Sequence, residues 1–267
     1  MRYFIIRLLK KLNVLSMCLL ALFITSEASA STIDDGTSLP PINTVLAPHS
    51  TVEGKTIAQW GEQWWTWVLG TPTTTADGFS NPQLDDTGAS AHLGDVGGPV
   101  FFVAGNFGGS TERTFSAPQG QYFLLPLVNS VWIPDPGETL QNAIDGNAVY
   151  INKVDSLHAV IDGVIITDVF DHRETTTAAS GGFSFTVPDN GLVAAGTYGP
   201  TAQDGYWLML TLTPGQHTIS FGGTSDSFTN VYSVIDHINV VPIPAAVWLF
   251  GSALAGFGVF SKRRKSS

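Results

Sequence analysis

The sequence predicts a mainly β fold: a β-sandwich with an amphipathic, tryptophan-rich helix packed on it. Three observations favour this class: six short runs rich in β-branched and aromatic residues, turn dipeptides between them, and one stretch with helical periodicity. A jelly roll is one arrangement open to such strands, and the helix either packs on a sheet or caps one end. A parallel α/β fold would need helices alternating with the strands, and the sequence lacks that pattern.

The helix is predicted over residues 56–69, in the stretch TIAQWGEQWWTWVLG. Thr56 is suited to the N-cap, and Gln59 three residues later completes a capping box. Trp65 lies beyond one edge of the apolar face, so it is the indole we expect to remain accessible for stacking on a ligand. At 100° per residue the apolar face gathers Ile57, Trp60, Trp64, Trp67 and Val68.

The β-type runs begin after a polar loop at 71–97. Asp162-Gly163 predicts a tight hairpin, and Pro214-Gly215 predicts a second one between the runs on either side of it. One helical segment, at 138–151, interrupts the strands. The runs are PVFFVAG, QYFLLPLVNSVW, LHAVIDGVIITDVF, FSFTV, YWLMLTLTPGQHTISFGG and VYSVIDHINVV.

The N-terminus has the features of a secretory signal peptide over residues 1–30. A basic start precedes an apolar core, and Ala28-Ser29-Ala30 provides a small-residue cleavage site, so we expect the mature chain to begin near Ser31. A retained anchor helix is the alternative. An extended leader at 31–51 and a single domain at 52–240 follow.

Charge and cysteine content narrow the functional class. Between Ser31 and Val241 only four lysines and arginines stand against 21 acidic residues, a net charge of −17. Such a field repels nucleic acids, so nucleic-acid binding is excluded. Because Cys18 in the signal peptide is the one cysteine, the exported domain must be held together by its core rather than by disulfides.

Candidate metal ligands are few. Asp171-His172 and Asp236-His237 place a carboxylate beside an imidazole, but neighbours in a strand point to opposite faces, and neither a His-x-His nor a His-Glu-x-x-His motif occurs. Asp85 and Asp86 in the loop NPQLDDTG are the candidates for a calcium site, against the alternative of a solvated acidic loop.

The same loop follows the aromatic helix and either forms one wall of a binding cleft or only connects two elements. The predicted ligand surface consists of Trp65, Asn81, Asp85 and Asp86. No catalytic residue is predicted, because G-x-S-x-G is absent and the domain has no thiol. A pair of carboxylates for glycoside cleavage stays open, since only their separation in space tests it.

The C-terminus has three parts. Ile243 to Phe260 are mostly apolar and long enough to span a bilayer, and the basic residues that follow are typical of the cytoplasmic side. Residues 241–265 resemble the PEP-CTERM sorting signals, in the variant with V-P-x-P-A. The motif is Val241, Pro242, Ile243, Pro244 and Ala245, and the basic tail is Lys262, Arg263, Arg264 and Lys265. The resemblance implies processing by an exosortase of a Gram-negative bacterium that makes exopolysaccharide. A permanent anchor is the alternative.

A broader resemblance covers residues 56–223. QWGEQWWTWVLGTP, NPQLDDTG, GGPVFFVAGNFGGSTERTF and GQHTISFGG are similar to segments of an uncharacterised group of secreted bacterial proteins. That group often carries cysteines where this chain has Ala91 and Phe115, so the resemblance implies that hydrophobic contact replaces a disulfide here. The resemblance implies no reaction.

Together these features predict an exported, non-enzymatic protein. Signal peptidase and an exosortase process it, it passes transiently through the inner membrane, and it ends at the cell surface or in the extracellular matrix, where it binds carbohydrate or matrix. A carbohydrate-active hydrolase or lyase and a calcium-stabilised structural module are the alternatives.

Overall fold

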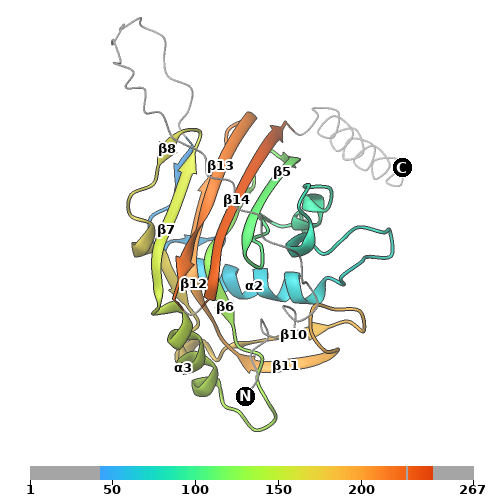
Figure 1. The fold of residues 1–267 in the computed structure, drawn as a ribbon, viewed down its shortest axis with the longest axis vertical. Coiled ribbons are helices and arrows are strands. Elements are labelled where there is room, and N and C mark those ends of the chain that lie inside the picture. Colours follow the sequence, from blue (N-terminus) through green and yellow to red (C-terminus); the bar gives the residue numbers. More distant parts are fainter. Residues whose placement is uncertain (1–42, 227, 243–267) are drawn as a thin grey trace, which may run out of the picture. The chain divides into compact units, whose positions relative to one another are not determined.

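The structure, a computed structural model, describes residues 43–226 and 228–242 as one compact unit that begins at Asn43. The predicted signal peptide, most of the leader and most of the sorting signal lie outside the described residues. The prediction of a mainly β fold is confirmed, because strands far outweigh the two α-helices described (Figure 1). Neither of those helices is long and apolar enough to cross a membrane.

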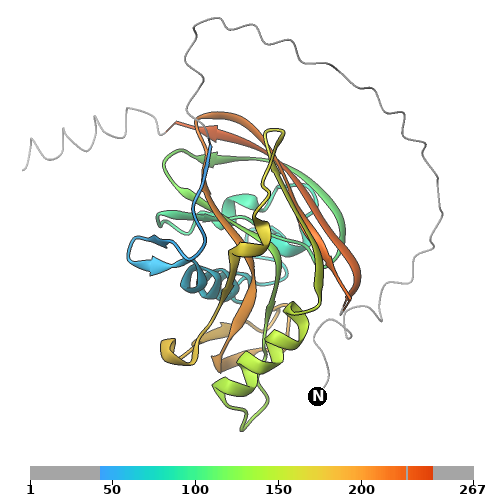
Figure 2. The same ribbon diagram turned by 90° about the vertical axis from the view of Figure 1, so that its left-hand side faces the viewer.

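Two five-stranded sheets make up most of the domain. The inner sheet has the order β1-β12-β6-β4, with β9 also paired to β12, and its strands are β1 (Thr44–Val45), β4 (Val100–Phe102), β6 (Tyr122–Val131), β9 (Arg173–Thr175) and β12 (Gln203–Thr211). The outer sheet has the order β5-β14-β13-β7-β8, and its strands are β5 (Gly109–Pro118), β7 (Val154–Ile161), β8 (Val164–Ile165), β13 (Gly215–Ser225) and β14 (Phe228–Val241). Figures 1 and 2 show the two sheets facing each other.

Smaller elements complete the unit. Two pairs of antiparallel strands form small sheets of their own. They are β2 (Thr51–Val52) with β3 (Lys55–Thr56), and β10 (Phe183–Val187) with β11 (Gly196–Thr201). The α-helices are α2 (Ile57–Gly70) and α3 (Leu140–Ile151), and short 3₁₀ helices occupy Pro82–Leu84, Ala91–Gly94, Val169–His172 and Ala178–Ser180. Thr44–Val45, within the predicted leader, is therefore an edge strand of the inner sheet.

The core lies between the two sheets. Alternate residues of each strand point inward, so Leu208 and Leu210 of β12 meet Ile219 and Phe221 of β13 in one buried cluster. All four side chains are at most 1% exposed. Burial of apolar area on this scale is the main force that holds together a domain without a disulfide.

Helix α2 covers the opposite face of the inner sheet and confirms the predicted helix. Its Thr56 N-cap and Gln59 form the expected capping box. Trp64 lies against Trp207 of β12 with ring centroids 5.4 Å apart. Buried indoles need a partner for their N–H groups. The indole nitrogens of Trp60, Trp64 and Trp67 donate to the backbone carbonyls of Val52, Val103 and Leu93.

The expectation that Trp65 stays accessible is wrong, since its side chain is only 6% exposed. The periodicity argument assumed a single packing partner for the helix. In the structure α2 packs against strand β10 as well as against the inner sheet, so the helix is covered on more than one side. A position at the edge of the apolar face was therefore a poor guide to the exposure of Trp65.

Local turn signals had mixed outcomes. The Asp162-Gly163 hairpin is confirmed: it joins β7 to β8, and both residues have the positive φ that a type I′ turn needs. The predicted hairpin at Pro214-Gly215 is wrong, because β12 belongs to the inner sheet and β13 to the outer one. The dipeptide carries the chain from sheet to sheet. The predicted helical segment is confirmed as α3, with a second capping box at Thr139 and Asn142.

Two strand pairs are parallel, which the hairpin pattern did not predict. Strand β4 pairs with β6, and β14 pairs with β5 over ten residues, from Tyr232 opposite Gly109 to Val241 opposite Pro118. The last described strand is thus inserted between β5 and β13.

Candidate functional site

The loop at 71–97 holds most of the predicted ligand surface, but two of its candidates are buried. Asn81 is 0% exposed; its amide nitrogen donates to the carbonyls of Val68 and Thr71 at the end of α2, and its oxygen accepts from Gln83 N. The residue therefore satisfies the carbonyl groups that the end of a helix leaves unpaired. Its surroundings exclude contact with a ligand in this conformation.

Asp85 is also buried and hydrogen-bonded within the loop. Its two carboxylate oxygens accept from Thr87 N and Oγ1 and from Ser90 N, at 2.7 to 2.9 Å. Burial raises the pKa of Asp85, but these hydrogen bonds outweigh it and leave the pKa below its ordinary value. The carboxylate thus holds the loop together.

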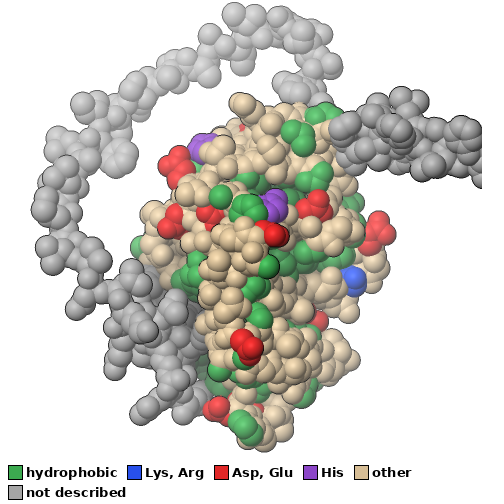
Figure 3. All heavy atoms as spheres, turned by 90° about the vertical axis from the view of Figure 1, so that its right-hand side faces the viewer, with side chains coloured by type: hydrophobic (Ala, Val, Ile, Leu, Met, Phe, Trp, Pro, Cys, Tyr) green, Lys and Arg blue, Asp and Glu red, His purple; other side chains and the backbone are tan. Residues whose placement is uncertain are grey.

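Asp86 is the exposed member of the predicted set, and it accepts a hydrogen bond from Thr111 Oγ1 at 3.2 Å. Asp85 and Asp86 are not joined by a third ligand-type side chain: among the residues described, no group of three or more histidine, cysteine, aspartate or glutamate side chains is placed to hold a metal. Figure 3 shows this side of the molecule, where acidic side chains are spread between hydrophobic ones and greatly outnumber basic ones.

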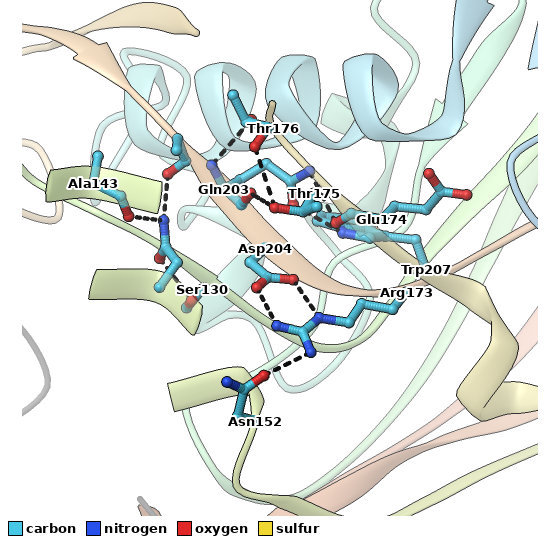
Figure 4. A network of polar contacts seen from close by, with 12 residues as sticks. Ser130, Ala143, Asn152, Arg173, Glu174, Thr175, Thr176, Gln203, Asp204 and Trp207 are labelled. Atoms are coloured by element: carbon cyan, nitrogen blue, oxygen red, sulfur yellow. Dashed lines mark hydrogen bonds and ion pairs between the residues drawn. The ribbon is translucent and has the colours of Figure 1, made fainter. Parts of the chain in front are cut away.

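A different polar cluster lies on strand β12, at the edge where β9 joins it (Figure 4). Alternation along the strand divides the cluster between two faces. Gln203 points towards α2, where it accepts from Trp207 Nε1 and donates to the carbonyls of Glu174 and Ala58. Asp204 points to the other face, towards the end of α3.

Asp204 and Arg173 form a bidentate ion pair. Arg173 Nε and Nη2 donate to the two carboxylate oxygens at 2.9 and 2.6 Å, and Nη1 donates to Asn152 Oδ1 at 2.8 Å. The hydrogen bond from Arg173 to Asp204 is the main cause that raises the pKa of Arg173. Asp204 is buried, whereas Arg173 is 31% exposed and Asn152 is exposed, so the cluster opens to solvent on the arginine side.

An exposed aromatic ring lies beside this ion pair. Phe170 is 48% exposed, and its ring packs edge-on against Tyr206, with centroids 5.6 Å apart. Tyr206 is the cross-strand partner of Arg173, so both side chains project from the same face of the sheet. We call Phe170, Arg173, Asp204 and Asn152 the rim site. Sequence reasoning missed it because its members come from three separate segments, with Asn152 at the end of α3, Phe170 and Arg173 just before and in β9, and Asp204 in β12.

A second arginine–aspartate pair is wholly internal. Arg113 of β5 and Asp236 of β14 are register partners, 3% and 0% exposed, with Arg113 Nε 3.7 Å from Asp236 Oδ1. Arg113 Nη2 donates to Gly105 O at 2.6 Å, but within the described residues neither oxygen of Asp236 has a hydrogen-bond partner. Burial raises the pKa of Asp236 to about 7, despite the opposing effect of Arg113.

The sequence did contain a signal for this pair. In β14 the inward positions are Val234, Asp236, Ile238 and Val240, so a carboxylate takes an apolar place in the alternation. Arg113 takes the same kind of place in β5. The expectation that Asp236 and His237 point to opposite faces agrees with the structure, since His237 bonds Glu112 at the surface.

A small cavity of about 10 Å³ adjoins Arg113 and is lined in part by Ala91 and Phe115. These are the two positions at which the resemblance to the secreted group implies cysteines. Phe115 stacks on Phe101 with centroids 6.0 Å apart.

Of the predicted sorting motif, Val241 and Pro242 are described and the rest lies outside the described residues. Val241 is the final residue of β14, and its carbonyl accepts from Gln119 N at 2.8 Å. No protein-family model, curated protein or solved structure matched this chain.

Proposed function

We propose that this chain is an exported surface protein of a Gram-negative bacterium whose domain binds neutral extracellular polysaccharide at the rim site and catalyses no reaction. Signal peptidase and an exosortase would process its two ends. The tripartite order of residues 241–265 and the A-x-A site at 28–30 support the route. We describe the domain as a β-sandwich of jelly-roll type, which fits two sheets sharing one core.

The observation that carries the binding proposal is the exposed Phe170 ring beside a fixed set of planar polar groups. Apolar faces of sugar rings pack on aromatic side chains, and sugar hydroxyls bond to carboxylate, guanidinium and amide groups. The Arg173–Asp204 pair is held in place by two hydrogen bonds, so these groups are arranged before a ligand arrives. Asn152 adds an amide on the solvent side.

The net charge of the domain indicates which class of polysaccharide it binds. The net charge of −17 between Ser31 and Val241 disfavours polymers rich in carboxylate or sulfate. The positive charge of Arg173 is neutralised by Asp204 and is not free to offset that repulsion. Neutral glycans are therefore the favoured class.

Affinity electrophoresis of residues 31–242 in gels containing neutral or acidic polysaccharides tests the proposal. We expect retardation by a neutral polymer and a fall in apparent affinity of at least about tenfold, or about 1.4 kcal/mol, for Phe170→Ala. The matched control is Phe79→Ala, which removes another exposed phenylalanine, from the 71–97 loop. This control should bind like the parent.

Each result has a distinct reading. Equal binding by the parent and Phe170→Ala would overturn the rim site, and an absence of retardation in every polymer would overturn carbohydrate binding. Release of reducing ends from the polymer would instead favour the hydrolase or lyase.

The sorting half is tested by mass spectrometry of the native C-terminus. Cleavage near Val241 to Ala245 is expected; an intact Ser267 in the membrane fraction would mean a permanent anchor.

A further inference from the structure

The end of strand β14 leaves almost no linker before the apolar C-terminal run. Val240 is 2% exposed and pairs with Gly215, and Val241 is still bonded to Gln119. Only Pro242 separates this strand from Ile243, where the sequence of 18 mostly apolar residues begins. Two residues reach at most about 7 Å.

That distance is comparable to the thickness of a headgroup layer. The polar layers add about 5 to 8 Å to each side of a hydrocarbon core of about 30 Å. If Ile243 marks the beginning of a membrane span, the end of the outer sheet cannot stand clear of the lipid. The domain must meet the bilayer with whichever surface lies beside Val241.

That surface carries exposed aliphatic side chains. The β7–β8 hairpin and the end of β14 lie at the same end of the domain in both ribbon views (Figures 1 and 2). In the hairpin, Val164 is 63% and Ile165 is 70% exposed, and Val241 is 40% exposed. Aliphatic side chains on an edge strand as short as β8 are costly in water and are favoured at a lipid interface.

The carboxylate in the hairpin turn is already compensated. Asp162 Oδ2 lies 2.7 Å from His217 Nδ1 and accepts from Asn43 Nδ2, and Asp162 Oδ1 accepts from Thr218 N. His217 Nε2 lies 2.7 Å from Thr213 O. The turn can therefore approach a membrane without presenting a carboxylate that lacks hydrogen-bond partners.

We propose that the hairpin end, defined as Val164, Ile165 and Val241, is a lipid-contacting surface that rests on the same bilayer into which residues 243–260 insert. The inference rests on the C-terminal span of the proposed function. It adds the orientation of the domain, in which the hairpin end of the outer sheet contacts the lipid. Val231 precedes Val241 by ten residues along β14, about 33 Å, and lies away from the lipid.

Residues 31–267, the chain before any C-terminal cleavage, suit a direct test because they contain no cysteine. A single environment-sensitive fluorophore is attached to Ile165→Cys or, as the matched control, to Val231→Cys, another exposed aliphatic residue of the same sheet. Both proteins are reconstituted in phosphatidylcholine vesicles, whose zwitterionic headgroups do not repel an acidic domain. Flotation of the vesicles confirms insertion.

We expect a blue-shifted emission for the probe at position 165 and loss of most of its emission when the lipids carry nitroxide quenchers. The probe at 231 should emit as in water and resist quenching. A floating protein whose two probes behave alike overturns the orientation and leaves the span intact. A protein that does not float overturns both the orientation and the span.

Polysaccharide binding by residues 31–242 is independent of both results.

Discussion

The described part of the chain contains two arginine–aspartate pairs, which differ in burial and in hydrogen bonding. Arg173–Asp204 sits at the rim, with two short hydrogen bonds and an arginine 31% exposed. Arg113–Asp236 sits inside, with 3.7 Å between nitrogen and oxygen and a bare carboxylate. A buried pair offsets the cost of desolvation only when its geometry is excellent. The rim pair holds the polar groups of the rim site in place. The inner pair lowers the stability of the fold, and the burial of the surrounding apolar core outweighs this cost.

The largest effect should come from breaking the inner pair. Arg113→Met leaves Asp236 without its partner at 0% exposure, and we expect a loss of about 3 to 5 kcal/mol of unfolding free energy at pH 8. Urea denaturation measures it. The double variant Arg113→Met, Asp236→Leu should recover most of the loss, and a double variant as unstable as the single one would contradict this account.

The pH dependence of stability should come next in size. Burial raises the pKa of Asp236 from 3.8 to about 7, so the folded state holds its proton where the unfolded state has lost it. The contribution of this proton to the free energy of unfolding is complete below about pH 4. It falls by up to about 1.4 kcal/mol per pH unit as the pH rises, and it is lost once the pH has risen through the folded pKa of about 7. Melting curves from pH 4 to 8 should flatten in Asp236→Asn. Parallel curves for the two proteins would refute the assignment.

Breaking the rim pair should cost less. Arg173→Met leaves Asp204 buried, but water can enter from the exposed arginine side, so we expect about 1 to 3 kcal/mol. Asn152→Ala removes only the outer hydrogen bond and serves as the control, with a loss under about 1 kcal/mol. If Arg173→Met lowers the unfolding free energy as much as Arg113→Met does, the distinction between the two pairs is wrong.

The smallest effect is expected at the surface. Glu112 and His237 lie on the same two strands as the inner pair, with 3.0 Å between oxygen and nitrogen, but their side chains are 69% and 41% exposed. Glu112→Gln should change the unfolding free energy by less than about 0.5 kcal/mol. A larger change in urea denaturation would show that position on β5 and β14, rather than burial, sets the cost.

What could be predicted from the sequence was local. The capping box at Thr56 and Gln59 and the turn at Asp162-Gly163 involve atoms a few residues apart, and both were confirmed. Pro214-Gly215 has an equally strong turn signal, but whether the following strand turns back or crosses to another sheet depends on partners far away in sequence.

The candidate site depended on distant partners. Asn81 and Asp85 look like exposed loop residues, yet they satisfy buried backbone groups, and this use leaves no mark on the sequence. Arg113 and Asp236 are 123 positions apart and meet only because β5 and β14 are parallel. An alternation that includes a charged residue was the one available clue to them.

Strand order also has a consequence for the timing of folding. Strand β14 is the last of the described strands to be synthesised, yet it lies between β13 and β5. In the described part of the chain, β5 has no other sheet partner and must wait for a strand more than a hundred residues downstream. Because such long-range pairings form late, the outer sheet cannot close until residue 241 is available. Synthesis order therefore keeps the outer sheet incomplete until residue 241 has emerged.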